Sequence, residues 1–229
     1  MSVITRRRQE YIRTHVYNEA FRTEPKELHR VVLDDIGECG SLIDIGGAGG
    51  ELAHFALQRW PDCNVTVVDA DPCLVEIGAR RVPAQFVSGS AERLRFPDDE
   101  FEVATMIGVL SIFDTPAGVL SEALRVASRA VYVVGIANPF PVDVWVRWRY
   151  SDDQRGDKNL GYNCHSQATI DGILGRLGAK SWEWMPFTMP FDIEKHDDPI
   201  RSWTEMHNGR RELRNAVGSL PFSVLRIEV

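Results

Sequence analysis

The sequence is poor in cysteine and shows none of the usual metal-binding spacings. Its 229 residues contain four scattered cysteines, without a C-x-x-C pair: Cys39, Cys63, Cys73 and Cys164. We therefore expect reduced structural thiols rather than a disulfide framework or a zinc site. The six histidines also lack an H-E-x-x-H pattern, and we predict no metal.

Excess positive charge and long apolar runs are also missing. The formal net charge is −7, and residues 6–8, three arginines, are the only basic run near the N-terminus. This balance argues against a nucleic-acid partner. No apolar run reaches the roughly 18 residues of a membrane-spanning helix, and no signal peptide is visible. We expect a cytoplasmic monomer or homodimer acting on a small-molecule substrate.

The richest feature is a glycine-dense turn after an apolar segment that carries one acid. Residues 42–45 include Asp44, residues 46–50 contain four glycines and Ala48, and a helix is expected from Glu51. Small residues let a backbone approach a ligand closely, and a helix N-terminus suits an anion. The alternative is a tight turn without a ligand. A dinucleotide fingerprint would need a third glycine where Leu52 stands, which disfavours a nicotinamide-dependent oxidoreductase.

Further strands are expected in order along the chain. Residues 65–69 form a second strand that ends in Asp69, followed by a helix with Asp71 as N-cap and proline in its first turn. An acid at this place can accept the ribose hydroxyls of a nucleoside. Residues 102–110 and 130–137 predict buried fourth and fifth strands, with helical apolar spacing over 116–127 between them.

These segments resemble class I, Rossmann-like S-adenosylmethionine-dependent methyltransferases, in particular the small-molecule type 11/25 group. Residues 44–50 are similar to the motif D-x-G-x-G-x-G, with Ala48 for the middle glycine. Residues 86–102 are similar to the loop G-D-A-E-x-L-P-F-x-D-x-x-F-D, with Ser90 in place of its acid. The resemblance covers about residues 42–138.

The resemblance implies an α/β fold with a seven-stranded, mostly parallel sheet, helices on both faces and an N-terminal helical lid. We expect one methyltransferase domain over 1–229, with a cap (1–38), a cofactor-binding half (39–138) and a substrate-side half with inserts (139–229). The cofactor implied is S-adenosylmethionine. The residues implied to bind it are Asp44, Gly46, Gly47, Ala48, Gly50, Asp69, Ala70, Ser90, Ala91, Glu92, Ile107 and Gly108.

The acceptor side is less defined. Methyl transfer demands alignment of acceptor, carbon and sulfur, and a hydroxyl or acidic carbon also needs a base. The catalytic candidates are His165, Asp114 and Tyr162, and the substrate-binding candidates are Tyr17, Asn138, Arg147 and Trp148. Each could equally be a cap, a surface residue or core. Asn138 begins an N-P-F sequence, but it follows the fifth strand, whereas the N-P-P-Y/F motif of exocyclic-amine methyltransferases follows the fourth.

The remaining elements and two functions stay open. We expect an amphipathic helix around Arg147, a helix over 167–177, a strand over 181–188, a polar helix over about 199–217 and a last strand over 222–229. The favoured function is methyl transfer from S-adenosylmethionine to a small molecule. The alternative is a non-catalytic cofactor-binding or partner protein on the same scaffold, which the departures at Ala48 and Ser90 support.

Overall fold

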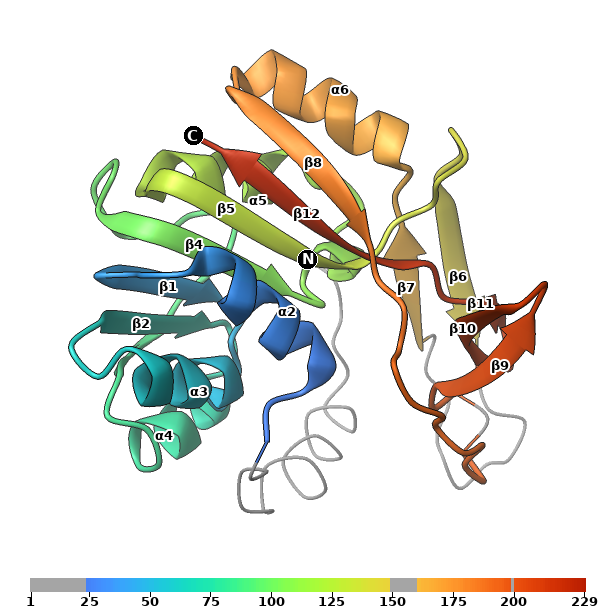
Figure 1. Cartoon of the computed structure of the whole chain (residues 1–229). Helices are drawn as coiled ribbons and strands as arrows, with labels where there is room; N and C mark the ends of the chain where they lie inside the picture. Colours follow the sequence, from blue (N-terminus) through green and yellow to red (C-terminus); the bar gives the residue numbers. More distant parts are fainter. Residues whose placement is uncertain (1–23, 149–159, 199) are drawn as a thin grey trace.

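The computed structural model describes residues 24–148, 160–198 and 200–229 (Figure 1). The helix expected before residue 24, with Tyr17, therefore lies outside the described residues. No helix within the described ranges is both long and apolar enough to cross a bilayer.

A seven-stranded sheet in the order β3-β2-β1-β4-β5-β12-β8 forms the centre of the molecule (Figure 1). Its strands are β1 (Ser41–Ile45), β2 (Asn64–Asp69), β3 (Gln85–Ser88), β4 (Phe101–Ile107), β5 (Ala127–Ile136), β8 (Ser181–Pro186) and β12 (Phe222–Glu228). Strands β1 to β5 pair in parallel, whereas β12 is antiparallel to both β5 and β8. The predicted fold class is confirmed, and the carboxyl ends of β3, β2, β1 and β4 meet at one edge.

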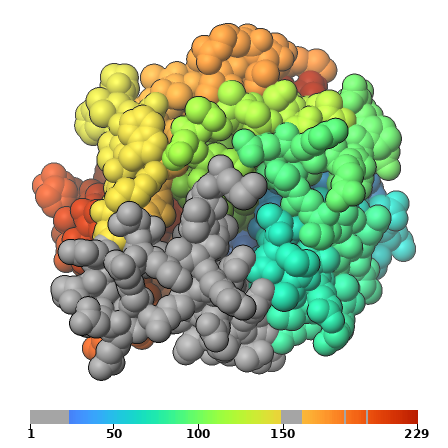
Figure 2. Space-filling model, turned by 180° about the vertical axis from the view of Figure 1, so that it is seen from behind, coloured from blue at the N-terminus to red at the C-terminus, as the bar shows by residue number. Residues whose placement is uncertain are grey.

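Helices cover both faces of the sheet. On one face, α2 (Glu27–Ile36) and α3 (Glu51–Arg59) share an apolar core with β1, β2 and β5. On the other, α5 (Ala117–Val126) and α6 (Gln167–Leu177) lie side by side, as Figure 2 shows from behind. Since Val32 and Leu33 of α2 are buried in that core, this part of the expected lid is a structural helix of the domain.

Two helices begin at side-chain N-caps, and the sequence predicts the first of them, Asp71. Asp71 accepts a 2.9 Å hydrogen bond from the Cys73 amide at the start of α4 (Pro72–Ala79). Ser166 accepts one of 3.1 Å from the Thr169 amide at the start of α6. Such caps satisfy backbone donors that the first turn leaves unpaired.

The polar helix expected over 199–217 is wrong. The segment forms a three-stranded antiparallel sheet of β9 (Trp203–His207), β10 (Arg210–Asn215) and β11 (Gly218–Ser219). Its first turn is Asn208-Gly209, and both residues have positive φ, 47° and 75°. An Asn-Gly pair between strands favours a tight hairpin turn, and this local signal outweighs the polar composition that suggested a helix.

The amphipathic helix expected around Arg147 is also wrong. Residues Val144–Trp148 form β6, which pairs antiparallel with β7 (Leu160–Cys164). The segment is rich in valine and tryptophan, which suit a strand better than a helix. The hairpin and the three-stranded sheet lie together beside the main sheet (Figure 1), and Asn215 of β10 is near enough to the Tyr162 side chain of β7 to lower its pKa.

Candidate functional site

The glycine turn packs so tightly against its neighbours that no side chain would fit at Gly46 or Gly47. The Gly46 amide donates to the Val68 carbonyl at 2.7 Å, which bends the chain toward the end of β2. Gly46 has φ +74°, and a Cβ there would lie 2.4 Å from Val109. A Cβ on Gly47 would lie 2.3 Å from a carboxylate oxygen of Asp44. These glycines are therefore required by the turn itself.

Asp69 fastens this turn to the end of β2. One of its carboxylate oxygens accepts a hydrogen bond from the Ala48 amide at 3.0 Å, and the other accepts one from the Asp71 amide at 2.8 Å. Ala48 has φ 51°, a left-handed conformation that alanine rarely adopts. Burial raises the pKa of Asp69, although the backbone hydrogen bonds oppose this shift. The carboxylate retains lone pairs for a further donor.

Asp44 lies buried behind the turn, with 3% of its surface exposed. It accepts a 2.8 Å hydrogen bond from the hydroxyl of Thr105, which is its register partner on β4. Burial raises the pKa of Asp44 to about 7, and the nearby charge of Asp69 adds to the rise. A neighbouring cation would make the ionised form favourable. Sequence reasoning missed Thr105, whose signal is a lone hydroxyl in an apolar strand.

The loop after β3 lies next to the end of β2, at the same edge of the sheet as the glycine turn. The Gly89 amide donates to the Asp69 carbonyl at 2.9 Å, so this loop lies against the end of β2. Ser90 pairs with Arg93 in an isolated bridge, and its hydroxyl accepts from the Glu92 amide at 3.2 Å. Ser90 therefore stabilises its own turn, at the position where the family motif has an acid.

Arg125 of α5 holds the same loop from behind, and sequence reasoning missed it. Its guanidinium donates to the carbonyls of Phe96 at 2.8 Å and Leu94 at 3.0 Å. It also pairs with Glu122, which accepts from the Leu94 amide at 2.6 Å. One arginine thus fixes a connection between β3 and β4 that contains no helix.

The end of β4 lies on the other side of the glycine turn. Gly108 has φ +72° and donates to the Val134 carbonyl at 2.7 Å, so the chain turns away sharply into the short 3₁₀ helix η2 (Leu110–Ile112). Because β4 pairs with β1, Ile107 and Gly108 lie beside the glycine turn. The sheet order thus gathers the segments 44–50, 69–70, 90–92 and 107–108 at one edge, as the sequence predicts.

The β6–β7 hairpin is tied to the loop after η2 by polar side chains. Asn163, with 2% of its surface exposed, donates to the Phe113 carbonyl at 2.8 Å and to the Asp114 carboxylate at 2.9 Å. Arg147 donates to Asn163 at 2.8 Å and to Asp114 at 3.4 Å. Sequence reasoning missed Asn163, which joins two of the predicted residues. The structure therefore brings together Asp114 and Arg147, two of the residues predicted for the acceptor side.

The other residues predicted for the acceptor side differ in their burial and in their hydrogen-bond partners. His165 is buried, and its Nε2 lies 2.8 Å from the same Phe113 carbonyl. Burial raises the pKa of Tyr162, whose ring packs 5.8 Å from that of Trp148. The Asn138 side chain is bonded within its own turn, to Val142 and Phe140. Trp148 has a buried indole N–H without a partner among the described residues.

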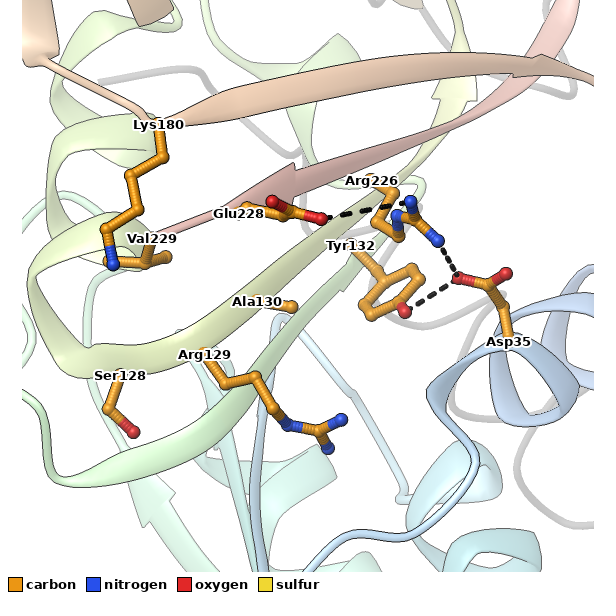
Figure 3. A pocket seen from close by; sticks show the side chains of 9 residues that line it. All are labelled: Asp35, Ser128, Arg129, Ala130, Tyr132, Lys180, Arg226, Glu228 and Val229. Atoms are coloured by element: carbon orange, nitrogen blue, oxygen red, sulfur yellow. Dashed lines mark hydrogen bonds and ion pairs between the residues drawn. The ribbon is translucent and has the colours of Figure 1, made fainter.

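A separate hollow of about 440 Å³ lies at the opposite, amino end of the parallel strands (Figure 3). Tyr132 donates to Asp35 there at 2.7 Å, and Arg226 pairs with Asp35 at 3.5 Å and with Glu228 at 3.9 Å. These groups satisfy one another and lie far along the strands from the glycine turn. Within the described ranges, no three His, Cys, Asp or Glu side chains gather as a metal site.

Sequence comparison matches the part of the chain that forms this site. Residues 42–129 match the family described as a methyltransferase domain. The ubiquinone/menaquinone biosynthesis C-methyltransferase UbiE of Paracoccus denitrificans is 31% identical over 121 residues, 48% of each chain. The demethylmenaquinone methyltransferase of Chlamydia trachomatis is 28% identical over 94 residues, 40% of this chain and 41% of that protein. The matches thus span less than half the length of these relatives.

Solved structures share the whole architecture at low sequence identity. The YcgJ protein of Bacillus subtilis aligns with a TM-score of 0.61 and 15% identity, covering 88% of this chain and 97% of that one. A SAM-dependent methyltransferase of Thermotoga maritima, a possible histamine N-methyltransferase, aligns with a TM-score of 0.56 and 15% identity, over 99% and 96%. The strand order is thus that of a Rossmann-like fold, and residues 42–129, which include the glycine turn, match a methyltransferase domain.

Proposed function

We propose that this protein transfers a methyl group from S-adenosylmethionine to a small-molecule acceptor. The observation that supports this most strongly is the Asp69 carboxylate, which the amides of Ala48 and Asp71 hold at the end of β2, beside a turn that excludes side chains. Its remaining lone pairs can accept ribose hydroxyls.

The residues around the turn fit this cofactor. The buried carboxyl of Asp44 would be ionised by a nearby ammonium or sulfonium charge, which offsets part of the cost of its burial. Ala70 follows the ribose residue, and Ser90, Ala91, Glu92, Ile107 and Gly108 would flank the adenine. Once bound, the cofactor supplies an electrophilic methyl carbon. Gly46, Gly47, Ala48 and Gly50 would surround its methionine part.

The acceptor would lie between the end of β4 and the β6–β7 hairpin. There the chain contributes mainly position, because in-line displacement depends on holding acceptor and methyl carbon in contact. Where the acceptor atom carries a proton, Asp114 is the best placed of the three candidates to take it, since its side chain is 78% exposed and is oriented by Asn163 and Arg147. The hidden Nε2 of His165 favours a supporting role.

The class of acceptor is a further part of the proposal. The names of the relatives refer to C-methylation in quinone biosynthesis, but the family match ends at residue 129, before the hairpin begins. On this chain, the rings of Trp148 and Tyr162 form an aromatic pair, and the Trp148 N–H has no partner among the described residues. We infer a planar, partly apolar acceptor with a carbonyl or hydroxyl oxygen, used by a cytoplasmic enzyme.

Calorimetry with S-adenosylmethionine and S-adenosylhomocysteine tests the proposal. Wild type should bind both in the micromolar range, and Asp69→Asn should lose at least about tenfold in affinity, the effect of roughly one hydrogen bond to a charged group. Asp62→Asn is the matched control, because Asp62 is exposed and precedes the opposite end of β2. Absence of binding by folded wild type would favour the non-catalytic alternative.

A further inference from the structure

Two of the four cysteines lie together at the amino ends of β1 and β2. Cys39 precedes β1 by two residues and Cys63 precedes β2 by one. The strands pair in parallel from Ser41 and Asn64, and the Asn64 amide donates to the Gly40 carbonyl at 2.9 Å. Extending this register sets Cys63 opposite Gly40, so Cys39 lies diagonally across from Cys63, in the same buried apolar cluster. The Cys39 thiol donates to the Ser41 carbonyl at 3.2 Å, and it lies close enough to Cys63 for each thiol to shift the pKa of the other.

We propose that Cys39 and Cys63 form an oxidisable dithiol, a modification site at which a peroxide converts the two thiols to an intramolecular disulfide. Paired strands lie about 4.8 Å apart and rise about 3.3 Å per residue, so a diagonal pair at their ends is expected within the Cα separation that a disulfide requires, about 4.4–6.8 Å. Cys73 lies on α4 and Cys164 on β7, so neither shares this position. The inference does not depend on the proposed methyl transfer.

The surroundings distinguish the two sulfurs. The neighbouring Cys63 thiol lowers the pKa of the Cys39 thiol, against the effect of burial and the charge of Glu102, and the Arg129 guanidinium lowers it further. The neighbouring Cys39 in turn raises the pKa of Cys63, and so does the burial of Cys63. Cys39 is therefore the sulfur that reaches the thiolate form more readily, which is the reactive form.

The chemistry balances with one peroxide molecule. The Cys39 thiolate attacks a peroxide oxygen, forming an S–O bond while the O–O bond breaks and hydroxide leaves. The Cys63 sulfur then attacks the sulfenic sulfur; the S–S bond forms, the S–O bond breaks, and the departing oxygen leaves as water with the Cys63 proton. The peroxide gains two electrons, and the two thiols lose them.

The disulfide would join two strands at the end opposite the glycine turn. The closed loop would contain β1, the turn and α3, so the bond would restrict the unfolded chain without touching the cofactor edge. We expect the melting temperature to rise on the order of 5–10 °C on oxidation, as loop closure and domain size suggest. Affinity for S-adenosylhomocysteine should change less than about twofold.

Peptide mass spectrometry of the purified full chain tests the proposal directly. After treatment with hydrogen peroxide and alkylation of free thiols, we expect a peptide linking Cys39 to Cys63, reversed by dithiothreitol, with Cys73 and Cys164 alkylated. Free or singly over-oxidised Cys39 and Cys63, or any other pairing as the main product, would overturn the inference.

Single variants test which sulfur reacts first. In Cys63→Ala the sulfenic acid on Cys39 should persist and be labelled by dimedone, whereas Cys39→Ala should show little labelling at Cys63. The thermal shift on oxidation should vanish in both. An undiminished shift in either variant would contradict the assignment, and the wild-type mapping decides the matter even where a variant folds poorly.

Discussion

Asp69 and Ala48 are joined by a 3.0 Å hydrogen bond between a carboxylate and a backbone amide. The residue proposed to hold the ribose is thus also the residue that shapes the glycine turn. Loss of its charge should affect the turn and the ligand together, so binding and stability must be measured side by side for every variant at this edge.

Asp44 should make the stability of the ligand-free protein depend on pH. Its pKa is raised to about 7 by burial, whereas an unfolded aspartate titrates near its ordinary value of about 4. Between these two pH values the folded state therefore binds one more proton than the unfolded state. The contribution of Asp44 to stability is fully present below pH ~4 and is lost as the pH rises toward 7, by up to about 4 kcal/mol. Asp44→Asn should remove this decline.

Urea unfolding at pH 5 and pH 8 measures the effect. Wild type should lose stability between the two, and Asp44→Asn should lose much less, while Asp62→Asn should keep the wild-type slope. Equal slopes in wild type and Asp44→Asn would show that the buried carboxyl is not the titrating group. The same variant should bind S-adenosylmethionine more weakly, since it lacks the charge.

Ala48 should tolerate glycine unusually well. Alanine in the left-handed conformation destabilises the folded state by on the order of 1 kcal/mol, and glycine avoids this cost. Glycine also makes the unfolded chain more flexible, which offsets part of that gain in stability. We expect Ala48→Gly to change the free energy of unfolding by less than about 1 kcal/mol, and Ala48→Val to destabilise by more, because a β-branched residue resists this conformation. A Val variant as stable as the Gly variant would refute this account.

Arg125 should matter for the loop after β3 more than its place on α5 suggests. Arg125→Ala would leave the Leu94 and Phe96 carbonyls without their donor, at a cost of about 2 kcal/mol. It should also increase hydrogen exchange in residues 89–98. Arg80→Ala is the control, since Arg80 is an exposed partner of Glu76 and should change stability by less than about 0.5 kcal/mol.

His165 can be separated into a structural and a catalytic role by two substitutions. Gln in its place can still donate to the Phe113 carbonyl, whereas Ala cannot. If His165 only supports the loop, His165→Gln should keep kcat within a few-fold and His165→Ala should lose stability. Loss of a general base would instead cost on the order of 10²–10⁴-fold in kcat for both variants.

The fold of residues 39–138 could be predicted because its signals are local in the sequence. The glycine turn, Asp69 and the cap at Asp71 each follow directly from the end of a strand, and the order of the strands brings these ends together. Their side-chain partners could not be read in the same way. Thr105 meets Asp44 only through the pairing of β1 with β4.

The acceptor half could be predicted less well, because there the local signals competed. Polar composition suggested a helix over 199–217, but the turn at Asn208 and Gly209 fixes a hairpin. Asn163 gave no signal beyond being a polar residue in a strand, since its role comes from a contact with Phe113 fifty residues earlier. The roles of Asn138, Tyr162 and Trp148 in binding or catalysis stay predictions.

The two small sheets are formed by segments that lie between strands of the main sheet in the sequence. The hairpin of β6 and β7 leaves after β5, and β9 to β11 lie between β8 and β12, so neither interrupts a strand of the cofactor half. Such insertions can be exchanged, lengthened or reshaped while the central layers keep their register. If the proposed acceptor and cofactor sites are right, a graft of 138–166 from one relative into another should exchange acceptor preference and leave cofactor binding unchanged.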